Sequence, residues 1–176
     1  MSQNPIVQFS HKYTQVFTVF TAFLLVLLLI IAIFAKKEPI FSKKAIMFLL
    51  ISLILGPGLL VNTVFKDNFG RARPSQIKEF GGQKEFTRVF EISNNCAKNC
   101  SFACGHSSAA YWFLSFGFVV APPLRRRVFI AALIFGTLVG VGRMVQGGHF
   151  LSDVIFSLFF VYFASKITYE IMYANR

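Results

Sequence analysis

A histidine, an aspartate and an arginine occur together in one short, otherwise apolar stretch from Gly142 to Asp153. On a helix, His149 and Asp153 would lie four residues apart on one face, within reach of each other. A carboxylate in that position could hold the imidazole in one tautomer and make it more nucleophilic. Arg143 offers a planar, charged fork for phosphate oxygens. The stretch therefore predicts a nucleophile, its orienting group and an anion-binding side chain.

A second cluster lies between Lys66 and Pro74, where the sequence reads K-D-N-F-G-R-A-R-P. Lys66 and Arg73 could hold different oxygens of one phosphate group. The alternative is a basic flank whose side chains reach lipid headgroups, which is common where a helix leaves a membrane. The other polar residues of this run are expected only to support the first two: Asp67, Asn68 and Arg71.

A third cluster runs from Phe102 to Ser108 and contains Cys104, Gly105 and His106. If a helix begins here, its unpaired backbone N–H groups would face an anion, and Gly105 would allow close approach. His106 could then protonate a leaving oxygen. A histidine at a helix start is also commonly a simple cap or a surface residue, so this cluster alone leaves both interpretations open.

The composition places these clusters in a membrane protein. The chain of 176 residues is 55 % hydrophobic, contains 23 phenylalanines and is only 14 % charged. Uncharged runs long enough to cross a bilayer extend over 13–35, 45–65 and 107–124, and shorter ones over 128–142 and 154–165. The formal net charge of +11 is dispersed between these runs, so anionic lipid headgroups are expected as partners and nucleic acid is not.

We therefore predict an all-α, polytopic membrane bundle in a single domain, 1–176, with about five transmembrane helices. Their expected ranges are 15–35, 45–65, 106–122, 127–145 and 149–172. Residues 1–14 should form an interfacial segment, with Ile6, Val7 and Phe9 facing lipid. Gly56-Pro57-Gly58 should kink the second helix, whose freed carbonyls need partners, and Pro122-Pro123 should close the third.

Basic residues predict the orientation of this bundle. The loops 36–44 and 123–127 are short and share a side, because two spans separate them; their basic residues are Lys36, Lys37, Lys43, Lys44 and Arg125 to Arg127. The positive-inside rule makes that side cytoplasmic. The long loop 66–105 and the turn 146–149 then face the other side, which is the periplasm in a bacterium, and loops of that length are usually functional.

In order along the chain, the clusters read K-x6-R-P, then G-H, then R-x5-H-x3-D. This signature resembles the type 2 phosphatidic acid phosphatase (PAP2) superfamily and spans residues 66–153. The resemblance implies that His149 attacks phosphorus, Asp153 orients it, and His106 acts as general acid and then as base. It also assigns phosphate binding to Lys66, Arg73 and Arg143, with Gly105 and Cys104 contributing mainly backbone N–H groups.

Two of the three motifs depart from the family pattern. The second motif is usually P-S-G-H, and here Ala103 and Cys104 stand in place of proline and serine. The third usually begins with serine and arginine, and here Gly142 precedes Arg143. Two hydroxyls that could bind phosphate are therefore absent. We expect no metal and no cofactor, because the cationic side chains can neutralise a phosphate and no carboxylate cluster is present.

Three cysteines recur every fourth residue in the long loop: Cys96, Cys100 and Cys104. A zinc site is not expected, because its fourth ligand would have to be His106, which already has a task. A disulfide between Cys96 and Cys100 is a reasonable hypothesis for an oxidising periplasm.

The motifs favour a phosphatase for a lipid phosphate monoester or diphosphate in the outer leaflet of a bacterial inner membrane, with its active site facing the periplasm and no obligate protein partner. Within the family, the K-D-N-F-G-R-A-R-P run and the E-F-G-G segment resemble bacterial lipid A 1-phosphatases. Phosphatidylglycerophosphate and undecaprenyl diphosphate phosphatases share the signature and remain alternatives. An anion transporter or channel, or a lipid-binding protein without turnover, are the rivals from other classes.

Overall fold

The computed structural model describes residues 5–34 and 41–174, and side chains from residue 13 onward. All regular secondary-structure elements in these ranges are helices. The only β-type pairing there is an isolated bridge between Ile77 and Lys84. The all-α prediction is confirmed. The predictions that concern Lys36 and Lys37, and the lipid-facing side chains of Ile6, Val7 and Phe9, lie outside the described residues.

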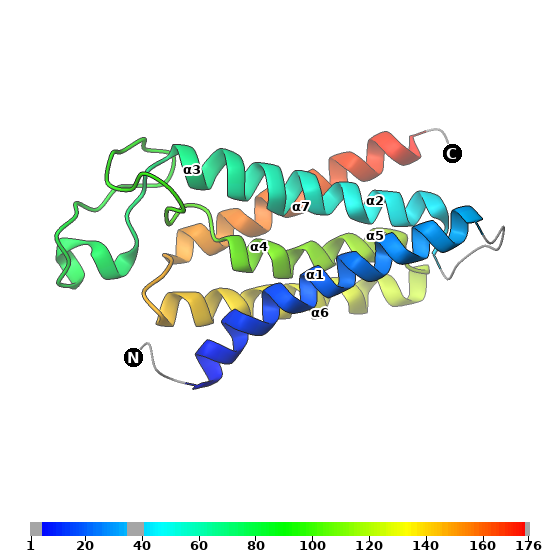
Figure 1. The fold of residues 1–176 in the computed structure, drawn as a ribbon, viewed down its shortest axis with the longest axis horizontal. Coiled ribbons are helices and arrows are strands. Elements are labelled where there is room, and N and C mark those ends of the chain that lie inside the picture. Colours follow the sequence, from blue (N-terminus) through cyan, green and yellow to red (C-terminus); the bar gives the residue numbers. More distant parts are fainter. Residues whose placement is uncertain (1–4, 35–40, 175–176) are drawn as a thin grey trace.

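Four helical stretches are long and apolar enough to cross a membrane: Tyr13–Phe34, Lys43–Asn68, Pro122–Val145 and Leu151–Tyr173. They belong to helix α1 (Pro5–Phe34), to α2 (Lys43–Leu53) with its continuation, to α6 (Pro122–Val145) and to α7 (Leu151–Tyr173). Figure 1 shows them side by side along the long axis of the molecule. Helix α1 begins ten residues before the predicted span, within the segment expected to be interfacial.

The predicted third span is present in a shorter and less regular form. It consists of α4 (Gly105–Tyr111), the 3₁₀ turn η4 (Trp112–Ser115) and α5 (Phe116–Val119). This helical segment packs against α6, α7 and α1, and its Trp112 is fully buried, with Nε1 donating to the Leu49 carbonyl at 3.0 Å. This segment ends at Val119, three residues before Pro122, and Pro122 also opens α6, where no intrahelical acceptor exists for the N–H that proline lacks.

The second span continues past its proline instead of ending there. After α2 the helix widens into a π-helix, η1 (Ile54–Phe65), with Pro57 inside it, and ends with the short α3 (Lys66–Asn68). Side chains add hydrogen bonds just after the proline: Asn62 Nδ2 donates to the Pro57 carbonyl at 2.7 Å and Thr63 Oγ1 to the Gly58 carbonyl at 3.2 Å.

The segment from α3 to α4 forms an irregular cap over one end of the bundle (Figure 1). It contains two single turns of 3₁₀ helix, η2 (Pro74–Gln76) and η3 (Lys78–Phe80). The turn between α6 and α7 lies at the same end, whereas α6 begins at the opposite end. All three predicted clusters therefore lie at one end of the bundle, away from Arg125, Arg126 and Arg127.

Candidate active site

His149 lies in the turn between α6 and α7, one residue before Phe150, the N-cap of α7. The prediction that His149 and Asp153 lie on the same helix is therefore wrong, because the helix begins only at Leu151. The two side chains still approach each other, with His149 Nδ1 3.6 Å from Asp153 Oδ2. Asp153 also accepts the Phe150 N–H at 2.9 Å, a favourable position for a carboxylate in the first turn of a helix.

The direct partner of His149 Nδ1 is the carbonyl of Ser101, at 2.7 Å. Because a carbonyl can only accept, Nδ1 carries the proton, and in the neutral ring the lone pair lies on Nε2. The Ser101 hydroxyl donates to Asp153 Oδ2 at 2.6 Å, so one residue contacts both members of the pair. The sequence analysis missed Ser101, because a serine in a long loop carries no signal of its own.

Cys104 is the N-cap of α4, is fully buried and faces His149. Burial alone would raise the pKa of its thiol, but the adjacent His149 and Arg143 lower that pKa below its usual value. Burial likewise lowers the pKa of His149, yet Cys104 and Asp153 outweigh it, so the pKa of His149 is raised. The imidazole and the thiol therefore stabilise each other's charged forms.

Lys66 and the start of α4 meet at Gly105. Lys66 Nζ lies 3.5 Å from Asn62 Oδ1, one helical turn earlier. A Cβ atom on residue 105 would lie only 2.5 Å from Asn62 Oδ1 and 3.1 Å from Lys66 Nζ. Only glycine allows this approach, so the lysine reaches the N-terminus of α4 because residue 105 lacks a side chain.

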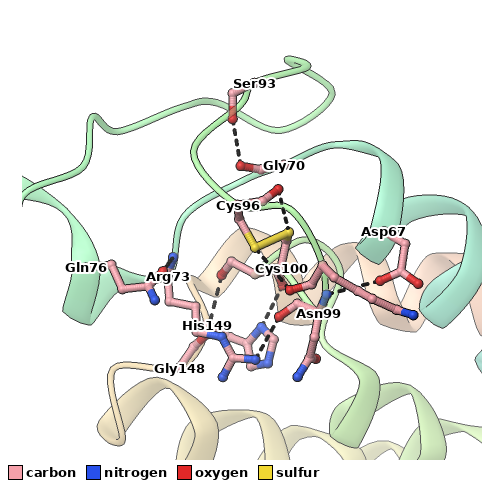
Figure 2. The surroundings of a disulfide bond; sticks show 12 residues. Asp67, Gly70, Arg73, Gln76, Ser93, Cys96, Asn99, Cys100, Gly148 and His149 are labelled. Atoms are coloured by element: carbon pink, nitrogen blue, oxygen red, sulfur yellow. Dashed lines mark hydrogen bonds between the residues drawn. A yellow bond between two sulfur atoms is a disulfide. The ribbon is translucent and has the colours of Figure 1, made fainter.

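Arg73 is held by a turn that the disulfide closes. Its Nη2 donates to the Asn99 carbonyl at 2.9 Å, and the Asn99 N–H donates to Asp67 Oδ1 at 3.1 Å. Cys96 and Cys100 are disulfide-bonded with Cα atoms 5.6 Å apart, which confirms the hypothesis from their spacing. Figure 2 shows this bridge with Arg73, Asn99 and His149 around it.

Arg143 lies in the last turn of α6 and is 7 % exposed. The turn that follows folds back over it: the Gly148 N–H donates to the Arg143 carbonyl at 3.0 Å, and a Cβ on residue 148 would lie 2.9 Å from Arg143 Nη2. The guanidinium also donates to Gln146. Within the described part of the chain, no acceptor lies within hydrogen-bond distance of its buried Nε, which leaves a donor for an anion.

The eight predicted site residues thus lie at one end of the bundle. Lys66, Arg73 and Arg143 are close enough for their charges to repel one another, as expected for a pocket that receives an anion. His106 is the second residue of α4 and is 8 % exposed, and α4 begins at the end of the bundle where the turn between α6 and α7 lies (Figure 1). No group of three His, Cys, Asp or Glu side chains among the described residues is placed to hold a metal ion.

Comparisons with known proteins agree with this arrangement. A relative from Francisella tularensis subsp. novicida, named lipid A 4′-phosphatase, is 42 % identical over 96 % of this chain and 76 % of its own length. A lipid A 4′-phosphatase from Rhizobium leguminosarum is 36 % identical over 59 % of the chain and 45 % of its own length. A lipid A 1-phosphatase from Rhizobium etli is 35 % identical over 72 % of the chain and 50 % of its own length.

No solved structure matches the chain. The family model described as the PAP2 superfamily matches residues 45–176, which include all three clusters and the helices that carry them. The resemblance drawn from the motifs is therefore confirmed, and the chain belongs to the PAP2 superfamily, whose members include membrane lipid phosphatases.

Proposed function

We propose that this phosphatase removes a phosphate from lipid A through a phosphohistidine formed on His149. The observation that carries the proposal is the hydrogen bond from His149 Nδ1 to the Ser101 carbonyl, because it leaves Nε2 as the nucleophilic atom. Three cationic side chains and the N-terminus of α4 lie at the same end of the bundle. Together they provide a nucleophile beside an anion-binding pocket.

In the first step, His149 Nε2 forms a bond to phosphorus while the bond from phosphorus to the lipid oxygen breaks. His106 gives its proton to that oxygen, so the lipid leaves as an alcohol. In the second step, a water oxygen attacks the phosphohistidine, His106 takes the proton from that water, and the N–P bond breaks. Inorganic phosphate leaves and His149 returns to its neutral form.

Lys66, Arg73 and Arg143 would bind the non-bridging oxygens and stabilise their charge in both steps. Phosphoryl transfer demands mainly positioning and charge stabilisation from a protein, and each of these side chains already contacts the protein around it. Arg73 is held by Asn99, Arg143 lies under Gly148, and Lys66 lies against the glycine that opens α4. The Gly105 and Cys104 N–H groups would assist them, although the Cys104 N–H already donates to the Asp153 carbonyl at 3.3 Å.

We propose the 4′-phosphate as the preferred position, in place of the 1-phosphate that the motifs suggested. Its support is the 42 % identity to a lipid A 4′-phosphatase over nearly the whole chain, against 35 % over 72 % of the chain for a lipid A 1-phosphatase. The two positions also give a test of His106 as the general acid, because their leaving groups differ. The oxygen of the 1-phosphate is anomeric and leaves more easily, so replacing His106 should slow 4′-hydrolysis more than 1-hydrolysis.

We further propose that the site opens to the outer leaflet of the inner membrane, on the periplasmic side. Support comes from Arg125, Arg126 and Arg127, which lie at the opposite end of the bundle and mark the cytoplasmic side. Lys78 is exposed on the cap. In intact spheroplasts, a membrane-impermeant thiol reagent should label Lys78→Cys and not Arg126→Cys; the reverse labelling would overturn the orientation.

The substrate is tested with purified protein in detergent and EDTA, supplied with bisphosphorylated lipid A, phosphatidylglycerophosphate or undecaprenyl diphosphate. Phosphate release and mass spectrometric location of the remaining phosphate should show loss of the 4′-phosphate. His149→Ala should abolish turnover and Lys66→Ala should impair it strongly, whereas the exposed Lys98→Ala serves as the matched control. Loss of the 1-phosphate alone would overturn the position, and turnover of only another lipid would overturn lipid A.

The rival class is separated in sealed proteoliposomes. An anion transporter would move labelled phosphate or sulfate across the bilayer without hydrolysing lipid, and Lys66→Ala would reduce that flux. The phosphatase predicts hydrolysis without net anion flux. Flux without lipid turnover would overturn the proposal.

A further inference from the structure

Arg71 lies inside the cap and is 3 % exposed. Its Nη1 donates to Asp153 Oδ1 at 2.5 Å and to Ser152 Oγ at 3.0 Å, and its Nε donates to the Thr87 carbonyl at 2.9 Å. Asp153 is fully buried. The two charges therefore form a buried ion pair in which Nη1 and Nε of the arginine have further acceptors, and additional hydrogen bonds of this kind help a buried pair to be tolerated.

Aromatic rings fix the guanidinium in this position. Its central carbon lies 4.2 Å from the centre of the Phe150 ring and 5.5 Å from that of Phe86, and the two rings are 5.5 Å apart. Phe150 is the N-cap of α7, whereas Phe86 belongs to the cap over the bundle. Arg71 thus stacks on one ring from each segment, with little freedom to move.

The two oxygens of Asp153 have separate tasks. Oδ1 accepts from Arg71, whereas Oδ2 accepts from Ser101 and from the Phe150 N–H, and lies 3.6 Å from His149 Nδ1. Arg71 therefore reaches the nucleophile only through the carboxylate. It contacts no reacting atom, so its contribution must be electrostatic and positional.

Charge determines what that contribution is. A buried carboxylate without a cation would hold a proton on the adjacent imidazole, because the alternative is an uncompensated buried charge. A protonated imidazole cannot attack phosphorus. We propose that Arg71 is a positioning residue that neutralises Asp153, so that the carboxylate orients His149 without keeping it protonated. The inference rests on the proposed role of His149 as nucleophile.

Other charged groups also face His149. From the N-cap of α4, Cys104 favours the protonated imidazole. Arg143 from α6 and Lys66 from the second span interact with Cys104, and Arg73 from the cap interacts with Arg143 and Lys66. Within the described part of the chain, the hydrogen bonds to the Asp153 carboxylate come from Arg71, Ser101 and the Phe150 N–H, and from none of these four groups. Changing Arg71 alone therefore alters the balance of the aspartate–histidine pair and leaves these groups in place.

The variants are Arg71→Met, which removes the charge, and Arg71→Lys, which keeps it. Arg88→Met is the matched control, because Arg88 is an exposed arginine of the same cap. An opposite charge at this range shifts the protonation of a partner by about 1–3 pH units. In Arg71→Met, the acid limb of kcat/KM should therefore move upward by about one unit or more. Its activity relative to wild type should rise about tenfold from pH 6 to pH 8.5.

Imidazole ¹⁵N spectra give a second readout that needs no substrate. The chain has three histidines, so the His149 signals can be assigned with His149→Ala. The titration midpoint of His149 should rise in Arg71→Met and stay near wild type in Arg71→Lys and Arg88→Met. In Arg71→Met with Asp153→Asn, where the pair has lost both charges, the midpoint should fall below that of wild type.

A purely structural role predicts something different. Arg71→Met would then lose the same fraction of activity at every pH, with the His149 midpoint unchanged, and that result would overturn the inference. If His149→Ala retained activity, the nucleophile assignment would fail instead. The spectra would still report whether Arg71 controls the protonation of the imidazole, so the two failures are distinguishable.

Discussion

Replacing Gly105 with alanine is a sharp test of how the pocket is built, because local and tertiary effects act in opposite directions. Gly105 is the first residue of α4, where alanine is the better helix former. Without tertiary contacts, the substitution should stabilise the protein by about 0.4–1 kcal/mol. The added Cβ would, however, lie 2.5 Å from Asn62 Oδ1 and 3.1 Å from Lys66 Nζ.

The size of the effect follows from these distances. An ordinary contact needs about 3.4 Å or more, so the amide oxygen must retreat by about 0.9 Å. Asn62 is not free to do so, because its Nδ2 is bonded to the Pro57 carbonyl at 2.7 Å, and losing that bond would cost about 1 kcal/mol. The lysine must shift as well. A displacement of about 1 Å in a group that binds the reacting phosphate can cost about 100-fold in rate.

We therefore expect Gly105→Ala to lower kcat/KM by about 30- to 100-fold while the protein still folds. The assay is phosphate release from the lipid substrate at several concentrations, with thermal unfolding followed in the same detergent. Gly58→Ala is the matched control, because the nearest atom to its added Cβ, the Leu53 carbonyl oxygen, lies at an ordinary 3.5 Å. Activity of Gly105→Ala within threefold of wild type would refute the steric argument.

Three further predictions concern the surroundings of the nucleophile. Cys104→Ser should move the acid limb of kcat/KM to lower pH, because the thiol helps to raise the pKa of His149 despite burial; a pH–rate profile checks this, and an unchanged limb would contradict it. Ser101→Ala should lower kcat about tenfold with KM nearly unchanged, since a hydrogen bond to a carboxylate is lost while the carbonyl remains; steady-state kinetics decide. Replacing Cys96 and Cys100 with serine should cost about 2 kcal/mol of stability and make thermal unfolding insensitive to reductant, whereas reductant should lower the Tm of wild type.

The helices were largely predictable because uncharged runs report membrane spans directly. The ranges of α6 and α7 agree with the sequence to within a few residues. The helical segment after Cys104 was less predictable. Its hydropathy indicated a full span, but burial among other helices allows a shorter element interrupted by a 3₁₀ turn, and hydropathy cannot separate these cases. Pro57 was recognised as a breaker, although its result is a π-helix supported by Asn62.

The site was predictable where residue type alone decides, and not where backbone atoms take part. The lysine, arginine and histidine residues in the three clusters predicted an anion-binding pocket. The acceptor for His149 Nδ1 is a main-chain carbonyl, which any residue could supply. The sequence therefore could not single out Ser101. The pairing of Arg71 with Asp153 joins positions 82 residues apart, and a single sequence does not reveal such contacts.

The cap over the bundle is part of the site rather than a cover for it. Ser101 and Arg71 belong to the cap and bind His149 and Asp153, and the Ser101 N–H donates to the Arg71 carbonyl at 2.9 Å. Arg73 is fixed by Asn99, beside the disulfide. A loop that had to open for every substrate would disturb each of these contacts. The lipid should therefore enter from the side of the bundle, with the cap staying in place through turnover.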